Sequence, residues 1–351
     1  MRAFAGVMIA TALAAACAGA ALAQPAPGSF DHTPAPAAHP TTGISLPVGK
    51  CVNLGNMLEA APNEASWGGR VFQDSDAAAI KEAGFATVRL PVWFSGHAPD
   101  KPPYTIDPAW MARMRHVVDA NLARGLNVIL DMHNFDPLFE DPAGNTARLA
   151  ELWRQVALAF RDEPASLWFE IQNEPHARLT NANLLATFAP ALAAIRASNP
   201  TRPVVIGGQD WSGINSLATL QLPDDPYVVP TFHYYLPMAF THQGADWIHP
   251  TPKMGRHYGL PEDRQALDVH LLLVKDYIRR TGRVPFLGEY GAIERIPAAE
   301  RADYYRTVSQ AFASIGVQSC AWAYLNTFPI FGSDGKLLPG MEGIATTTTL
   351  Q

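Results

Sequence analysis

Short apolar runs alternate with longer amphipathic stretches from about residue 50 to residue 325. Short runs rich in valine, isoleucine and aromatic residues are typical of strands that are buried on both faces. Stretches with apolar residues three and four positions apart are typical of helices. The predicted strands lie at 50–55, 86–92, 126–132, 167–172, 203–207, 227–234, 285–289 and 319–325. The predicted helices lie at about 75–83, 107–124, 145–160, 181–197, 264–280 and 298–314.

The order of these elements predicts the fold class. Eight predicted strands with helices between them favour an α/β (β/α)8 TIM barrel, a single catalytic domain over residues 45–332. A doubly wound sheet would explain the alternation equally well, but Gly49 precedes the first predicted strand and no glycine-rich phosphate loop follows it. Asp107 followed by Pro108 predicts the capped start of the second helix.

The N-terminus has the pattern of an export signal. Arg2 precedes the alanine-rich apolar run 7–21, and small residues then offer a cleavage site after Ala23. The run is too short and too rich in alanine to favour a membrane anchor. A lipoprotein anchored at Cys17 is a weaker alternative, because Ala14 stands where a large aliphatic residue is usual.

The segments that flank the predicted domain are not expected to join its core. Residues 24–44 are rich in proline and alanine and predict an extended leader, and residues 333–351 predict a poorly ordered tail. After cleavage of residues 1–23 we expect an exported monomer, periplasmic or secreted, with no membrane attachment.

The composition of the chain limits the classes of partner that it is expected to bind. Of the 351 residues, 48% are hydrophobic and 17% are charged, which is enough apolar material for a sizeable core. The formal net charge is -6 and no basic stripe is present, so the sequence argues against a nucleic acid partner.

Two cysteines, Cys51 and Cys320, would remain after export into an oxidising compartment. They could form a disulfide or stay as buried thiols. In a closed barrel the first and last strands are neighbours, and each cysteine lies near the start of its strand. We therefore expect a disulfide at the amino-terminal rim of the barrel.

Polar side chains gather at the carboxyl ends of successive predicted strands, the face on which barrel enzymes carry their active sites. Two of them are glutamates, Glu174 and Glu289, and hydrolysis of a glycosidic bond needs two acids. The others are Asn53, Asn56, Glu59, Arg89, Asp131, His133, Asn134, Asn173, His233, Tyr235 and Trp322. Each also has a structural interpretation on its own, such as an ion pair of Arg89 with Asp131, but together they favour a site.

Aromatic residues in the predicted loops suit stacking on sugar rings, although packing beneath long loops is the alternative for each. The four loop tryptophans are Trp67, Trp93, Trp211 and Trp247. The longest connection follows strand 227–234, and it contains His242, Gln243 and Trp247 as candidates for substrate contacts.

Taken together, these motifs resemble glycoside hydrolase family 5, the cellulase-type family of the retaining clan of (β/α)8 barrels, over about residues 45–332. Asn-Glu-Pro at 173–175 is similar to the family's proton-donor motif, and Gly-Glu-Tyr-Gly at 288–291 is similar to its nucleophile strand. The other matching positions are Arg89, His133, His233, Tyr235 and Trp322.

The resemblance implies double displacement with retained anomeric configuration. Glu289 would attack the anomeric carbon, while Glu174 would protonate the leaving oxygen and then deprotonate water. Arg89 and Tyr235 would keep Glu289 ionised, and the charge of Glu289 would raise the pKa of Glu174. Asn173 would reach the sugar 2-hydroxyl. The two histidines, His133 and His233, would bind sugar hydroxyls or hold the neighbours of the glutamates.

The implied function is endo-hydrolysis of β-1,4-glucan, with an oligo- or polysaccharide substrate and no cofactor or metal. The alternatives are another β-glycan (mannan, xylan or β-1,3-glucan) and an exo-acting glucosidase. A metal-dependent hydrolase built on His133, Glu174 and His233 is a further alternative, although no His-x-His or His-Glu-x-x-His motif is present. A non-catalytic carbohydrate-binding barrel is the last, but it would not need two close acids.

Overall fold

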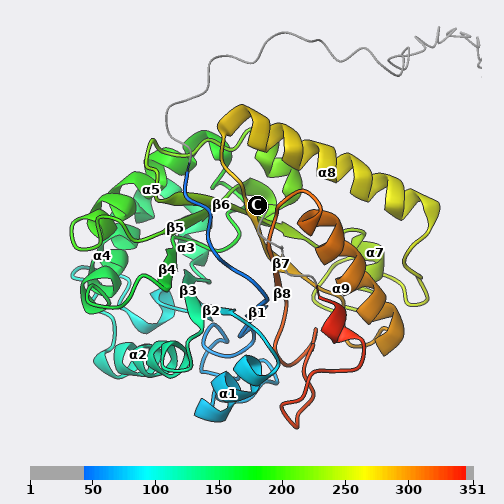
Figure 1. Ribbon diagram of the computed structural model, residues 1–351. Coiled ribbons are helices and arrows are strands. Elements are labelled where there is room, and N and C mark those ends of the chain that lie inside the picture. The colour runs from blue at the N-terminus through cyan, green and yellow to red at the C-terminus, as the bar shows by residue number, and fades with distance from the viewer. Residues whose placement is uncertain (1–42, 345–351) are drawn as a thin grey trace, which may run out of the picture. The chain divides into compact units, whose positions relative to one another are not determined.

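Eight parallel strands close into a barrel in sequence order, and helices surround it (Figure 1). The computed structural model describes residues 43–344, so the expected signal peptide and nearly all of the expected leader lie outside the described residues. The strands are β1 (Cys51–Asn53), β2 (Thr87–Val92), β3 (Asn127–Met132), β4 (Leu167–Glu170), β5 (Val204–Gly207), β6 (Val228–Tyr234), β7 (Phe286–Tyr290) and β8 (Ser319–Ala321). The (β/α)8 prediction is confirmed.

The six predicted helices are all present, with ends within a few residues of the predicted ones. They are α1 (Asp74–Glu82), α2 (Pro108–Leu122), α4 (Pro142–Ala159), α5 (Asn181–Arg196), α8 (Pro261–Thr281) and α9 (Ala298–Ala313). The Asp107 carboxylate caps α2 by accepting from Ala109 N at 2.8 Å. Short helices occupy the loops: η1 (Ser95–His97), α3 (Asp136–Glu140), α6 (Gln209–Ser212), η2 (Ile214–Ala218), α7 (Met238–Thr241) and η3 (Met341–Gly343).

Within residues 43–344, no helix combines the length and the apolar character that a membrane crossing requires.

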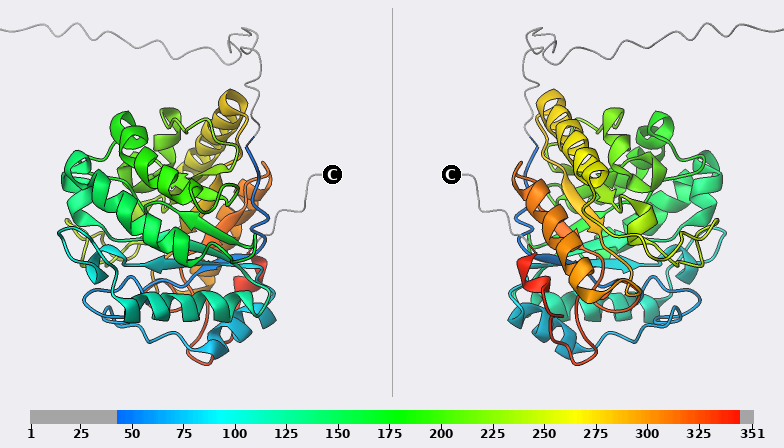
Figure 2. Two further views of the ribbon diagram at one scale, coloured as in Figure 1. Left: turned by 90° about the vertical axis from the view of Figure 1, so that its left-hand side faces the viewer. Right: turned by 90° about the vertical axis from the view of Figure 1, so that its right-hand side faces the viewer.

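The segment after β8 differs from the prediction. We expected a poorly ordered tail from residue 333, but Phe331 pairs with Leu337 and the side chains of Met341 and Ile344 are buried. Figure 2 shows η3 beside α9. This short stretch has no apolar periodicity in the sequence, and its order comes from packing against the rest of the domain. The domain therefore extends at least to Ile344, beyond the expected boundary at 332.

The amino-terminal half of the barrel interior is apolar. Strand side chains alternate between the two faces of a sheet, so every second residue points inward. Leu46 and Val48, which precede β1, join this inner layer and close the amino end of the barrel. The strand residues of the layer are Cys51, Ile129, Trp168, Val205, Val229, Phe286 and Cys320. The intervening residues, such as Val128 and Leu130, pack outward in the larger core under the helices.

A disulfide joins Cys51 to Cys320 within this apolar layer. The two residues are register partners of β1 and β8, and their Cα atoms are 4.3 Å apart. The bond links residues 269 positions apart in sequence and closes the barrel between its first and last strands. A loop of that size restricts the unfolded chain strongly, which stabilises the fold by about 4–5 kcal/mol in chain-entropy terms.

We predict that the double substitution C51S/C320S lowers the thermal midpoint by about 8 °C or more, because it releases that restriction on the unfolded state. The bond lies at the amino end of the strands, so kcat/KM at 25 °C should stay within about twofold of wild type. Thermal unfolding and initial rates on the same preparations check both values. An unchanged midpoint would contradict the stabilising role of the bond.

Candidate active site

A polar layer lies directly above the apolar one. It follows from the same alternation, because the residue two positions after an inward apolar residue also points inward. Asn53 follows Cys51 in this way, Asp131 follows Ile129, and Glu170 follows Trp168. On β2 the inward residue at this level is Arg89, which is the register partner of Asn53. These polar side chains are all buried.

Strict alternation along β7 would point Glu289 outward, because Phe286 points inward. A register shift changes this: Phe232 pairs with Leu287, but the next residue, His233, pairs with Glu289. Gly288 is therefore an extra residue, a bulge that turns Glu289 toward the barrel axis. A Cβ on Gly288 would lie 2.7 Å from Thr231 Oγ1, so only glycine fits this bulge.

Glu174 comes from the turn that follows β4. Its backbone has φ of 48°, in the left-handed region that a non-glycine residue seldom adopts. Asn173 N donates to Met132 O at 2.8 Å, which fixes this turn to the end of β3. Strained backbone of this kind is concentrated at functional sites.

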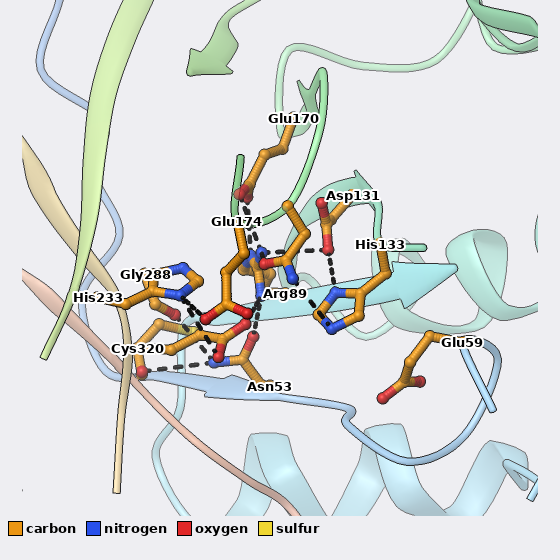
Figure 3. Close-up of polar contacts among 12 residues, drawn as sticks. Asn53, Glu59, Arg89, Asp131, His133, Glu170, Glu174, His233, Gly288 and Cys320 are labelled. Atoms are coloured by element: carbon orange, nitrogen blue, oxygen red, sulfur yellow. Dashed lines mark hydrogen bonds and ion pairs between the residues drawn. The ribbon is translucent and has the colours of Figure 1, made fainter. Parts of the chain in front are cut away.

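Arg89 connects the polar layer (Figure 3). Nε and Nη2 donate to the two carboxylate oxygens of Glu170 at 2.7 and 2.9 Å. Nη1 donates to Glu289 Oε1 at 2.6 Å and to Asn53 Oδ1 at 2.9 Å. Nη2 also donates to Asn173 Oδ1 at 2.8 Å. All five guanidinium N–H groups are thus satisfied, and the buried charge is compensated.

Asp131, His133 and Asn173 complete a ring of contacts with Arg89. Asp131 Oδ2 lies 3.1 Å from Arg89 Nη2 and accepts from His133 Nδ1 at 2.6 Å. With its proton on Nδ1, His133 accepts from Asn173 Nδ2 through Nε2 at 3.3 Å. The ring fixes both the histidine tautomer and the orientation of the Asn173 amide.

The two glutamates face each other across His233. His233 Nδ1 lies 2.8 Å from Glu174 Oε1 and 3.6 Å from Glu289 Oε2. Tyr235 donates to the same Glu289 oxygen at 2.9 Å. One ligand atom from each of Glu174, His233 and Glu289 lies within 4.8 Å of the other two. The two carboxylates are therefore close enough to act on one bond.

Burial is the main cause of the pKa shifts in this cluster. It raises the pKa of Glu174, and the charge of Glu170 adds to the effect. The direction agrees with the prediction, but the main cause is burial rather than the charge of Glu289. Burial also raises the pKa of Asp131 to about 7 and lowers that of His233 to about 4. The imidazole of His233 is therefore neutral near pH 7.

Above the glutamates lies a cavity of about 530 Å³. Its lining contains nine of the side chains selected from the sequence, and aromatic rings make up much of its wall. The lining residues are Asn56, Trp67, His133, Glu174, Tyr235, His242, Trp247, Glu289, Trp322, Thr327 and Phe328. The Trp322 ring is stacked on His133, with ring centres 5.7 Å apart.

The family model for cellulase, glycosyl hydrolase family 5, matches residues 49–327. The chain belongs to glycosyl hydrolase family 5. Endoglucanase H of Acetivibrio thermocellus is 35% identical over 279 residues, which cover 78% of this chain and 29% of that protein. Endoglucanase A of Ruminococcus albus is 28% identical over 296 residues, 77% of this chain and 79% of that protein. This chain thus spans less than a third of the length of Endoglucanase H.

Solved structures of family 5 proteins show the same fold. A hyperthermophilic endo-β-1,4-glucanase in complex with substrate matches with a TM-score of 0.82 and 35% identity, covering 85% of this chain and 96% of that one. Thermotoga maritima Cel5A, in complex with mannotriose, matches with a TM-score of 0.80 and 33% identity over the same shares of the two chains.

Two residues of this family 5 chain that we predicted to contact substrate do not line the cavity. Gln243 is buried and holds the loop after α7, accepting from Gly255 N at 2.7 Å and donating to Arg256 O at 2.9 Å. Its position in the long connection after the sixth strand suggested a cleft residue, but its amide binds the backbone of that loop. Trp211 lies outside the cavity lining and is stacked on His176, with ring centres 5.0 Å apart.

Three residues of the site were missed from the sequence. Glu170 was assigned to the interior of a strand, although a charged residue in an apolar run signals a buried partner. Thr327 and Phe328 line the cavity. They escaped notice because strand β8 ends at Ala321, so they belong to the loop that follows it.

The catalytic face could hold a metal ion at one place among residues 43–344, the trio of Glu174, His233 and Glu289. His133, which the metal alternative required, is not part of it. A metal would need the lone pair of His233 Nδ1, whose proton is donated to Glu174. Moving that proton to Nε2 would leave it without a partner in the described interior. The trio therefore fits proton transfer better than metal binding.

We predict that Arg89→Lys lowers kcat/KM by at least about 100-fold, because one ammonium group cannot hold Glu289, Glu170, Asn53 and Asn173 in place together. Arg113→Lys is the matched control: Arg113 pairs with Glu64 at 2.8 Å outside the site, and its variant should stay within about twofold. Initial rates check this, with thermal unfolding to confirm that both variants are folded. A folded Arg89→Lys enzyme with near-normal kcat/KM would contradict the role of Arg89.

Proposed function

We propose that the chain is a retaining endo-β-glycosidase that cleaves β-1,4-glucan by double displacement. The observation that carries the proposal is the spacing of the two acids, whose nearest oxygens lie within 4.8 Å. Retaining glycosidases place their carboxyl groups about 5–5.5 Å apart, whereas inverting enzymes leave about 6.5–9.5 Å for a water molecule. The short spacing supports direct attack by one carboxylate.

The contacts of the two acids support different roles for them. Glu289 accepts from Arg89 at one carboxylate oxygen and from Tyr235 at the other, and these two donors hold the carboxylate in a fixed orientation, as a nucleophile requires. Glu174 has a pKa raised by burial, and its side chain is about a quarter exposed toward the cavity. A carboxyl that keeps its proton and reaches the substrate suits the general acid.

The reaction then runs in two steps. Glu289 forms a bond to the anomeric carbon while the bond to the leaving oxygen breaks, and Glu174 gives that oxygen its proton. In the second step Glu174 takes a proton from water, the water oxygen attacks the anomeric carbon, and the bond to Glu289 breaks. Glu174 ends protonated and Glu289 ionised, as both began. Arg89 and His133 fix the amide of Asn173, and we propose that this amide contacts the sugar.

The cavity wall supports a neutral polysaccharide as substrate. Trp67 and Trp247 are about half exposed, at 45% and 51%, and Trp322 and Phe328 line the same cavity. Aromatic faces in such a cleft suit successive sugar rings. The related endo-β-1,4-glucanase structure makes β-1,4-glucan the first choice, and the mannotriose complex of Cel5A makes mannan the second. We further propose that the enzyme is exported and acts as a monomer on soluble chains.

A panel of defined hexasaccharides tests the proposal, with β-1,4-glucan, mannan, xylan and β-1,3-glucan linkages and each reaction run with and without EDTA. We expect fastest cleavage of the β-1,4-glucan, at internal bonds, with no loss of rate in EDTA. Chromatography of early products reads out the bonds cut. Release of single terminal sugars would contradict endo action, a loss of rate in EDTA would favour a metal enzyme, and binding without cleavage would favour a non-catalytic barrel.

A further inference from the structure

Two adjacent tyrosines on α9 reach loops on the catalytic face, although neither lines the cavity. Helix α9 lies outside the barrel beside β7 and β8 (Figure 1). Tyr304 and Tyr305 are fully buried, and both hydroxyl groups donate to backbone carbonyls at the carboxyl ends of strands. Each hydroxyl has one proton, so each of these contacts commits it.

Tyr304 holds the backbone on either side of Tyr235. Its hydroxyl lies 3.1 Å from Tyr234 O and 3.4 Å from Leu236 O. The carbonyl between them, that of Tyr235, accepts from Thr241 Oγ1 at 2.6 Å. Hydrogen bonds from Tyr304 and Thr241 thus hold the backbone around the residue that donates to Glu289.

Tyr305 holds the loop after β8. Its hydroxyl donates to Trp322 O and lies 3.1 Å from Phe328 O. The loop is closed on itself by Ala323 N, which donates to Phe328 O at 2.8 Å. Trp322 and Phe328 are the two aromatic residues of this loop that line the cavity. One hydroxyl therefore donates to one end of an aromatic wall and lies against the backbone of the other end.

Gly291 leaves the space for this contact. A Cβ at this position would lie 2.8 Å from the Tyr305 hydroxyl and closer still to Trp322 O. The last glycine of the Gly-Glu-Tyr-Gly sequence is therefore required by the contact of Tyr305 with the loop, rather than by its own backbone conformation.

We propose that Tyr304 and Tyr305 are positioning residues with separate roles: Tyr304 aligns Tyr235 on the nucleophile, and Tyr305 sets the aromatic wall that binds the sugar. The inference rests on the proposed roles of Glu289 and of the cavity. A shift of Tyr235 changes a contact to Glu289, which matters most in the transition state and so affects kcat. A shift of the aromatic wall weakens substrate and transition-state binding alike, which raises KM.

The test compares Tyr304→Phe with Tyr305→Phe on whichever panel glycan the wild-type enzyme cleaves fastest, so the substrate proposal can fail without affecting it. We expect Tyr304→Phe to lower kcat by about fivefold or more with KM little changed, and Tyr305→Phe to raise KM by about fivefold or more with kcat little changed. Tyr277→Phe is the control, because Tyr277 is buried in α8 and does not line the cavity, and it should change neither value.

Gly291→Ala provides a second route to the same contact, because its methyl group would displace the Trp322 carbonyl from the intact Tyr305 hydroxyl. We expect it to weaken oligosaccharide binding, as Tyr305→Phe does. Dissociation constants measured with both changes made in a Glu289→Ala background separate binding from turnover. If both tyrosine variants match Tyr277→Phe, or if both change kcat and KM by the same factors, the inference is overturned.

Discussion

The burial of Arg89 is the constraint on which the site depends. A guanidinium group removed from water needs compensating charge and a full set of acceptors, and the barrel supplies Glu170, Glu289, Asn53 and Asn173 around it. Each of these residues is fixed in turn. Arg89, which does not itself line the cavity, thus holds the nucleophile candidate Glu289, the Asn173 amide beside Glu174, and the floor of the cavity. Removal of that one cation would leave several buried carboxyl groups without compensation.

The barrel separates stability from chemistry along its axis. Its amino half contains the apolar layer, Leu46 and Val48, which close the end of the barrel before β1, and the disulfide between β1 and β8. Its carboxyl half contains the polar layer, whose burial raises the pKa of Asp131 and Glu174 and so opposes their ionisation in the folded state. Burial of the polar layer destabilises the folded state, and burial of the apolar layer below it offsets that destabilisation. Helix α9 lies outside the barrel but also supports the catalytic face, because its buried tyrosines bind the backbone of two loops there.

Much of this could be predicted from the sequence, since the periodicity of apolar residues is local information. The strand and helix positions, the barrel and the neighbouring cysteines all follow from it. The orientation of Glu289 could not be predicted in this way, because strict alternation along β7 points it outward and only the bulge at Gly288 turns it in. Gln243 and Trp211 were predicted to contact substrate because they lie in loops that follow strands, but neither lines the cavity. Loop positions depend on contacts between distant segments, such as that of Tyr305 with Phe328. The periodicity of apolar residues does not reveal such contacts.

If Arg89 and its partners hold two carboxylates close enough for direct attack on the sugar, the first product must retain the anomeric configuration of the substrate. Proton NMR recorded during the first minutes of hydrolysis of a β-1,4-linked hexasaccharide, or of the preferred β-glycan, resolves the new reducing end before mutarotation. We expect the β anomer to form first and the α anomer to grow in only as the two forms equilibrate. Initial formation of the α anomer would mean inversion by an intervening water molecule, and direct attack by Glu289 would then be wrong.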